Sequence, residues 1–458
     1  MQRFKHFRRR AALVSRPRPR GRRPLRDRRR PLCDRGAQAA AAAALAAAPA
    51  FATNGYFPHG YGLKAKGMGG ASLALAQDSL GGATNPAAMV WAGDRVDLGV
   101  DAFSPKRNAE RSGAGFATLN GQVESDKTLF WVPEAGFNRM LGSDLSLGLT
   151  VYGNGGMNTS YPQGNFNCGA GPANMLCGSG TLGVDLSQLI VAPTVAYKVA
   201  PTQSIGVALL LGYQRFKAEG LQAFDNAPGF PAFTGAPGSV TNNGYDSSTG
   251  FGVRIGWQGR FGAFTAGAAY TPKMNMGRFD KYKGLFAGNG DFDIPSHFGF
   301  GVAWSAMPTL TVTLDAMRIK YSDVPAVHNP SSNQAPLGAA NGPGFGWQDI
   351  DVFKLGLAWQ ATPALTLRAG YNRGDSPIGS ADVSFNILAP GVMTDHYTAG
   401  FTFAISPSSE ITGALMIAPR KTLSGSSFFN AILGPGAGGN ETIGMKQQTL
   451  GIAWATKF

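Results

Sequence analysis

The residues with the clearest potential for catalysis are a serine, a histidine and an acid near the end of the chain. Ser376 lies in the run Gly374-Asp375-Ser376-Pro377, and Asp395 and His396 follow further along. Ester hydrolysis of the serine type needs a histidine that takes the proton of the serine and an acid that orients the histidine. The serine run, however, falls in an expected loop without an evident oxyanion hole. An esterase therefore stays an alternative, and we predict that the protein is not an enzyme.

Cysteine and acidic residues offer little scope for a metal site. Cys168 and Cys177 lie in a stretch rich in Gly, Asn and Pro, and no His lies nearby. Two cysteines do not complete a four-ligand zinc site, and in an oxidising compartment we expect them to form a disulfide. Asp291 and Asp293 could attract Ca²⁺, but the solvated start of a strand is the better interpretation. We predict neither a metal nor a cofactor.

The elements that would position these residues are strands, and the end of the chain shows this most clearly. In residues 445–458 the side chains of one face are Leu450, Ile452, Trp454, Thr456 and Phe458. Alternation with a period of two indicates a β-strand with one apolar face. A chain that stops inside such a strand must pair it or leave an open edge. A closed barrel with an apolar outer face suits a bilayer and leaves no edge.

From Arg95 onward the chain shows thirteen further segments with the same alternation, which makes about fourteen strands in all. In residues 251–258, for example, large apolar side chains alternate with Gly, Arg and Gln. Short turns alternate with longer loops, which we expect at about 104–126, 154–181, 218–248, 275–290, 322–347, 374–394 and 422–444. This pattern predicts an all-β fold for residues 95–458, a transmembrane antiparallel β-barrel that ends on the periplasmic side. A soluble β-protein such as a sandwich or propeller is the alternative, but the side chains expected to face inward are too small and polar to fill a core.

The net charge of +14 is concentrated in the first part of the chain. Residues 1–52 hold 15 of the 41 Lys and Arg residues and only two acids, which leaves 26 bases and 25 acids for the rest. The basic bias thus belongs to a leader, and we predict no nucleic-acid partner. A basic arm that binds nucleic acid or anionic lipid is the competing interpretation.

The leader is typical of a secretory signal peptide with an unusually long basic region. An apolar run, 37–48, follows the basic residues, and Ala50-Phe51-Ala52 is a cleavage site of the A-x-A type. We therefore expect residues 1–52 to be a signal peptide that directs export by the general secretory route.

Residues 53–94 lack the alternation of a strand. They contain the glycine-rich run Gly67-Met68-Gly69-Gly70-Ala71 and end in Asn85-Pro86-Ala87, shortly before the first strand. A barrel of fourteen strands is wider than its own side chains can fill. We expect these residues to form an N-terminal hatch inside the lumen.

This segment resembles the hatch of the outer-membrane transporters of long-chain fatty acids and aromatic hydrocarbons. The resemblance rests on the glycine-rich run, on Asn85-Pro86-Ala87, on Trp131-Val132-Pro133, on Asp375-Ser376-Pro377 and on the strand count, and it spans 53–458. It implies that Gly67, Gly69, Gly70, Asn85, Pro86 and Ala87 are hatch or gating residues. It also implies an apolar pocket reached from the outer loops and a sideways exit near a kinked strand.

The resemblance suggests candidates for substrate binding as well. The run Tyr213-Gln214-Arg215-Phe216-Lys217 is similar to the stretch in which fatty-acid transporters hold a carboxylate, so we expect Arg215, with Phe216 and Lys217, to contact the substrate. Strict alternation would point Arg215 at lipid unless the strand bulges or the residue lies at the rim. Gln348 stands where related proteins often have Lys, which leaves room for neutral hydrocarbons. Phe224 and Phe286, in long loops, are expected to form part of a capture surface.

Together these features predict a protein of the Gram-negative outer membrane that takes up long-chain fatty acids or other hydrophobic compounds passively. Its expected partners are these compounds, the lipopolysaccharide and phospholipid of the membrane, and the outer-membrane assembly machinery. We expect a monomer. A general diffusion porin, an outer-membrane esterase and a structural or adhesive barrel are the alternatives.

Overall fold

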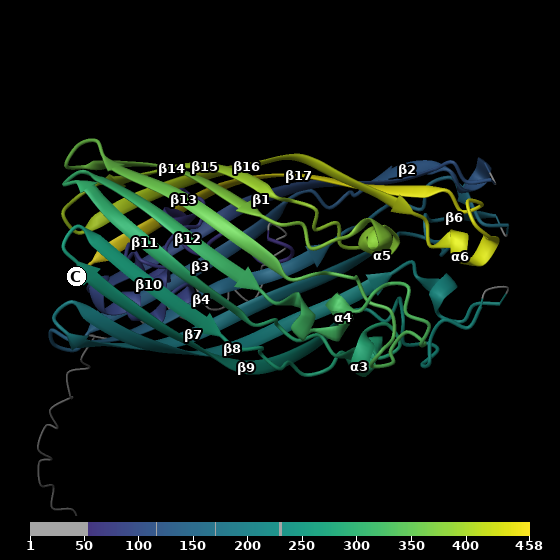
Figure 1. Ribbon diagram of the computed structural model, residues 1–458, viewed down its shortest axis with the longest axis horizontal. Coiled ribbons are helices and arrows are strands. Elements are labelled where there is room, and N and C mark those ends of the chain that lie inside the picture. The colour runs from purple at the N-terminus through teal and green to yellow at the C-terminus, as the bar shows by residue number, and fades with distance from the viewer. Residues whose placement is uncertain (1–53, 116, 170, 229–230) are drawn as a thin grey trace, which may run out of the picture. The chain divides into compact units, whose positions relative to one another are not determined.

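The computed structural model describes residues 54–458, except 116, 170 and 229–230. The predicted signal peptide lies outside these residues. Fourteen antiparallel strands form a closed β-barrel, because each pairs with the next along the barrel and the last, β17, pairs with the first, β1 (Figure 1). They are β1 (Arg95–Ser112), β3 (Phe130–Met140), β4 (Leu145–Asn158), β7 (Gly183–Ala200), β8 (Gln203–Glu219), β9 (Asp246–Phe261), β10 (Phe264–Thr271), β11 (His297–Met307), β12 (Leu310–Ile319), β13 (Ile350–Gln360), β14 (Leu365–Gly374), β15 (Asp395–Ala404), β16 (Ser409–Ser426) and β17 (Asn440–Lys457). The predicted fold class is confirmed.

The two faces of the strands differ as the alternation predicts. On β9, Phe251 is 75% exposed, whereas the side chains of Arg254 and Gln258 point inward and are buried. On β17, Leu450 and Ile452 are 66% and 58% exposed. A bilayer would cover such a surface, since an exposed apolar band all round a barrel is typical of outer-membrane proteins.

Several strands are longer than the sequence predicts. β1 continues to Ser112 and β16 to Ser426, so the expected loops at 104–126 and 422–444 are partly strand. In these outer parts the alternation is carried by polar and charged side chains, which hides it from a search for apolar periodicity. The loops also contain the short strands β2 (Gly121–Glu124), β5 (Phe166–Asn167) and β6 (Pro172–Ala173), which were not predicted.

Within the described residues, the loops carry only short helices. These are η3 (Ala117–Leu119), η4 (Gln222–Phe224), η5 (Asp280–Tyr282), α3 (Ala287–Gly290), η6 (Tyr321–Asp323), α4 (Pro325–His328), η7 (Ser380–Asp382), α5 (Val383–Asn386) and α6 (Phe429–Leu433). No helix in the described part of the chain is long and apolar enough to cross a bilayer. The predicted disulfide between Cys168 and Cys177 is present beside the β5–β6 hairpin, with the two Cα atoms 5.7 Å apart.

Residues 54–94, which we name the N-terminal segment, contain α2 (Leu63–Lys66), η1 (Ser79–Ala83) and η2 (Pro86–Trp91). The segment is almost entirely buried and contacts side chains on the inner face of the barrel. In Figure 1 it is the purple ribbon near the end of the barrel that carries the short turns. The Nζ atom of Lys66 lies 2.7 Å from Glu134 of β3 and also pairs with Asp101 of β1. Buried charges paired in this way fix the segment against the wall.

Candidate functional site

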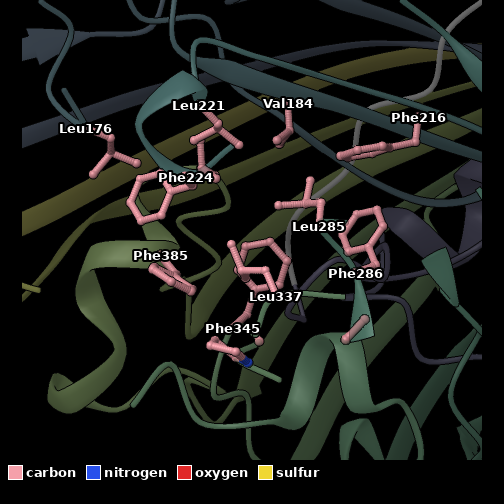
Figure 2. Close-up of a pocket in the computed structure, with 14 residues that line it drawn as sticks. Leu176, Val184, Phe216, Leu221, Phe224, Leu285, Phe286, Leu337, Phe345 and Phe385 are labelled. Atoms are coloured by element: carbon pink, nitrogen blue, oxygen red, sulfur yellow. The ribbon is translucent and has the colours of Figure 1, made fainter. Parts of the chain in front are cut away.

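An apolar cavity lies among the long loops at the other end of the barrel. Loops and strand ends that are far apart in the sequence contribute its lining, and Figure 2 shows their side chains pointing into a common space. The lining is formed by Leu176, Val184, Phe216, Leu221, Phe224, Leu285, Phe286, Ala326, Leu337, Pro343, Gly344, Phe345, Phe385 and Leu388. None of these side chains carries a charge. We name this set the loop cavity, and its chemistry suits a ligand without a strongly polar body.

Aromatic rings pack closely around the loop cavity. The ring centroids of Phe216 and Phe286 lie 4.6 Å apart, and those of Phe224 and Phe385 lie 5.9 Å apart. The cavity volume is about 50 Å³. In another protein a dry apolar cavity of roughly 150 Å³ binds benzene. A hydrophobic ligand would therefore have to displace some of these rings.

The structure places three of the five predicted substrate-binding residues around this cavity. Phe216 contributes from β8, Phe224 from η4, and Phe286 from the loop before α3. They share the lining with residues that the sequence did not single out, such as Leu337 and Phe385. Apolar residues in a long polar loop are the available signal for those neighbours, but loop residues have no periodicity that tells which of them meet.

Arg215 and Lys217 are not brought to the cavity. They follow the outward alternation of β8, and the guanidinium of Arg215 lies 4.7 Å from the ring centroid of Tyr245. The Nζ atom of Lys217 pairs with Glu219 at 2.8 Å. The Tyr245 hydroxyl donates a hydrogen bond to Asp185, and burial together with this bond raises the pKa of Tyr245. The bulge that would turn Arg215 inward is absent, since β8 pairs in regular register with β9 through this residue.

Gln348 also lies outside the loop cavity. Its side chain is exposed and donates to the carbonyl of Gly346 at 3.2 Å. The neighbouring Trp347 is fully buried and donates to Asn386 at 2.6 Å. The absence of a lysine at position 348 therefore does not change the charge of the cavity.

The predicted gating residues all lie in the contact between the N-terminal segment and the barrel. Asn85 donates from Nδ2 to the carbonyls of Leu73 and Trp257, at 2.7 and 2.9 Å, and accepts from the amide of Ala87. It also caps η2, with Pro86 in the first turn. One side chain thus ties two parts of the segment to β9.

The glycines of this contact allow close backbone approach. Gly70 has φ +81°, and a Cβ atom there would lie 1.7 Å from the carbonyl oxygen of His59. Gly69 has φ +66° and lies against the backbone of Tyr371. Gly67, with φ −65°, faces Gly400 of β15. A left-handed conformation at positions 69 and 70 favours glycine.

The ladder between β3 and β4 is incomplete. The two strands pair from Ala135 and Val151 down to their turn, but residues 130–134 of β3 and 152–158 of β4 do not pair with each other. Pro133 supplies no N–H group for the missing ladder, and β4 shifts register between Gly153 and Gly155. We name this stretch the seam. The amide of Gly156 donates instead to the carbonyl of Tyr56 in the N-terminal segment, at 3.3 Å.

The residues with apparent catalytic potential do not form a triad. Ser376 is exposed, and its hydroxyl contacts only the backbone of Ile378. His396 is buried inside the barrel with its ring 6.2 Å from that of His59. Asp395 accepts from Tyr371 and Arg373.

The expected solvated strand start at Asp291 and Asp293 is wrong. Phe292 and Asp293 are buried, and Asp293 pairs with Lys273 at 3.0 Å. These residues lie in the loop before β11, where Phe292 packs against Phe286. Burial and the nearby Asp293 raise the pKa of Asp291. Within the described residues, no group of three or more His, Cys, Asp or Glu side chains is arranged to hold a metal.

Solved structures share this fold. The toluene transporter TodX of P. putida is 18% identical, covers 87% of this chain and 99% of its own, and has a TM-score of 0.64. A FadL homologue of Pseudomonas aeruginosa is 16% identical over 88% of this chain and 100% of its own, with a TM-score of 0.63. The toluene transporter TbuX of Ralstonia pickettii is 18% identical over 87% and 99%, with a TM-score of 0.60.

Sequence comparison gives the family directly. No curated protein matches the sequence. Residues 39–421 match the model of the family described as outer membrane protein transport protein (OMPP1/FadL/TodX). The match spans most of the chain, and the barrel agrees with it. The chain therefore belongs to the OMPP1/FadL/TodX family of outer membrane transport proteins.

Proposed function

We propose that the protein carries hydrophobic compounds passively into the cell across the Gram-negative outer membrane. The observation that carries this proposal is the loop cavity, an uncharged aromatic chamber at the end of the barrel opposite the N-terminal segment. A compound captured there would be shielded from water as it enters the barrel.

The energetic reason for such a path is the cost of hydrating apolar surface. Each methylene exposed to water costs about 0.8 kcal/mol. A ten-carbon chain would thus pay roughly 8 kcal/mol to cross a water-filled pore. An apolar path removes most of this cost and needs no energy source when the compound runs down its gradient.

We further propose that the N-terminal segment acts as a hatch and that compounds leave sideways through the seam. The buried pairs of Lys66 with Asp101 and Glu134 support a segment that stays in place. The missing ladder between β3 and β4 supports a wall that separates there more easily than elsewhere, because no strand hydrogen bonds have to break. Export by the general secretory route and function as a monomer complete the proposal.

The substrates we propose are long-chain fatty acids or neutral hydrocarbons such as toluene. Two of the solved structures with this fold are named as toluene transporters and one as a FadL homologue. The uncharged loop cavity accepts the apolar part of either class.

Binding to the purified protein tests the proposed role of the loop cavity. Replacing the buried Ala326, which lines it, with Phe should fill the remaining space. We expect A326F to weaken binding of radiolabelled toluene and palmitate at least about tenfold, or about 1.4 kcal/mol. The matched control is A303F, at a buried alanine of β11 outside the cavity. Unchanged binding in a folded A326F protein would contradict the role of this cavity.

A further inference from the structure

Arg107 of β1 occupies an unusual position at the outer end of the seam. Its Nη1 donates to the carbonyl of Asn158, the last residue of β4, and its Nη2 donates to the carbonyl of Lys127, shortly before β3. One side chain thus joins the two chain segments that flank the unpaired stretch. The guanidinium also lies 5.6 Å from the ring centroid of Phe130, the first residue of β3.

This guanidinium is buried without a salt bridge, and the carboxylate within its electrostatic range, Asp185, accepts a hydrogen bond from Tyr245 instead. Arg107 is 5% exposed, and none of the ion pairs among the described residues includes it. Some buried bases on the inner face do have such a partner: Arg111 pairs with Glu441 and Arg95 with Asp97 and Glu410, whereas Arg254 and Lys354 form no ion pair with the described residues. A buried cation that lacks an anion is unfavourable, and an incoming anion would relieve this cost.

Donors for such an anion are available. The Nε of Arg107 has no hydrogen-bond partner among the described residues. Neither does the hydroxyl of Tyr161, which is fully buried and lies within electrostatic range of Arg107. A guanidinium and a phenol together match the two oxygens of a carboxylate.

Arg107 also lines a second cavity, whose wall combines apolar side chains with residues of the seam. Its apolar walls include Phe103, Met157, Trp347 and Met445, while Gly156 and Asn158 belong to the end of β4 that pairs with β7 but not with β3. Its volume is about 10 Å³, close to the smallest space that holds one water-sized group. A carboxylate needs more room than this, so a head group would reach Arg107 by displacing neighbouring side chains, with its tail against the apolar walls.

We propose that Arg107 is a latch on the seam that recognises the carboxylate of an amphipathic acid. In the absence of ligand the guanidinium holds the ends of β3 and β4 through backbone carbonyls. An incoming carboxylate takes over these donors and frees the two carbonyls. This leaves the segments joined here by the hydrogen bonds from the Asp126 amide to the Ser160 carbonyl and from the Ser160 amide to the Ser125 hydroxyl, and so lets the seam widen more easily. This inference rests on the proposed function and adds a residue that separates acidic from neutral substrates.

The test compares two ligands that share a ten-carbon chain. Binding of decanoate and of 1-decanol to the purified protein in detergent at pH 7.5 is measured for wild type and Arg107→Met. We expect decanoate to bind about tenfold more weakly to the variant, with 1-decanol changed less than twofold. Arg107→Lys should recover only part of the difference, because lysine keeps the charge and loses the planar fork. Tyr161→Phe should also weaken decanoate selectively.

Arg368→Met is the matched control. Arg368 is likewise without a carboxylate partner among the described residues, but its guanidinium binds Gln77 and Thr402, away from the second cavity. We expect this variant to bind both ligands like wild type. Equal losses of decanoate and 1-decanol in Arg107→Met, or no loss of either, would overturn the latch while leaving the proposed function intact. If wild type binds neither ligand, the proposed function fails as well.

Discussion

Glycine at position 70 shows how single residues determine the fit of the N-terminal segment. We expect Gly70→Ala to destabilise the docked N-terminal segment by at least about 1–2 kcal/mol. L residues are unfavourable at positive φ, and the added Cβ would clash with the carbonyl of His59. Limited trypsin digestion measures the effect, since Lys64 and Lys66 are buried cleavage sites in the folded segment.

Gly81→Ala provides the control for this prediction. A Cβ at Gly81 would lie 3.7 Å from Ala88, an ordinary contact, and its φ is not in the left-handed region. The segment of the control should resist trypsin like wild type. Equal digestion of the two variants would show that close approach at Gly70 is not what limits the fit.

At the scale of elements, the docking of η2 on β9 depends on Asn85. Replacing Asn85 with Ala leaves the carbonyls of Leu73 and Trp257 without this donor, at a cost of about 1–3 kcal/mol. We expect Asn85→Ala to assemble as a heat-modifiable barrel but to show intermittent current in planar bilayers, because the segment leaves its place more often. The control is Asn120→Ala, whose side chain binds only the backbone of Ala114 in an outer loop. A current trace as quiet as that of wild type would contradict this role of Asn85.

Strands were predictable where apolar side chains alternate. The outward faces of β9 and β17 follow the sequence pattern residue by residue, because lipid favours apolar groups at every second position. The outer parts of β1 and β16 were not predictable in this way, since their exposed residues, such as Lys106 and Lys421, are charged. The register shift between Gly153 and Gly155 lies beside the contact of β4 with Tyr56 of the N-terminal segment. A local sequence pattern does not predict such a long-range contact.

The site was only partly predictable for a related reason. Aromatic residues in long loops indicated Phe224 and Phe286, but their partners come from other loops, and sequence distance says nothing of which loops meet. Arg215 followed the alternation of its strand and faces outward with Tyr245. Arg107, by contrast, lies within a stretch expected to be a loop, so its inward direction became visible only in the structure.

At the scale of the whole molecule, the fourteen-stranded wall and the buried N-terminal segment support the proposed hydrophobic transporter over a general porin. A porin keeps a water-filled channel along its axis. Here the inner faces of β1, β3, β9 and β12 contact the N-terminal segment through Asp101, Glu134, Trp257 and Asp315. An open aqueous path is not expected while these contacts persist.

Uptake by proteoliposomes tests this claim most directly. Vesicles that contain the purified protein in their membrane and a toluene-binding scavenger inside are exposed to radiolabelled toluene. A parallel sample is exposed to radiolabelled glucose. We predict that the protein accelerates toluene uptake severalfold over protein-free vesicles and leaves glucose uptake at the protein-free rate. Glucose uptake accelerated as strongly as toluene uptake, or toluene uptake equal to that of protein-free vesicles, would contradict the account.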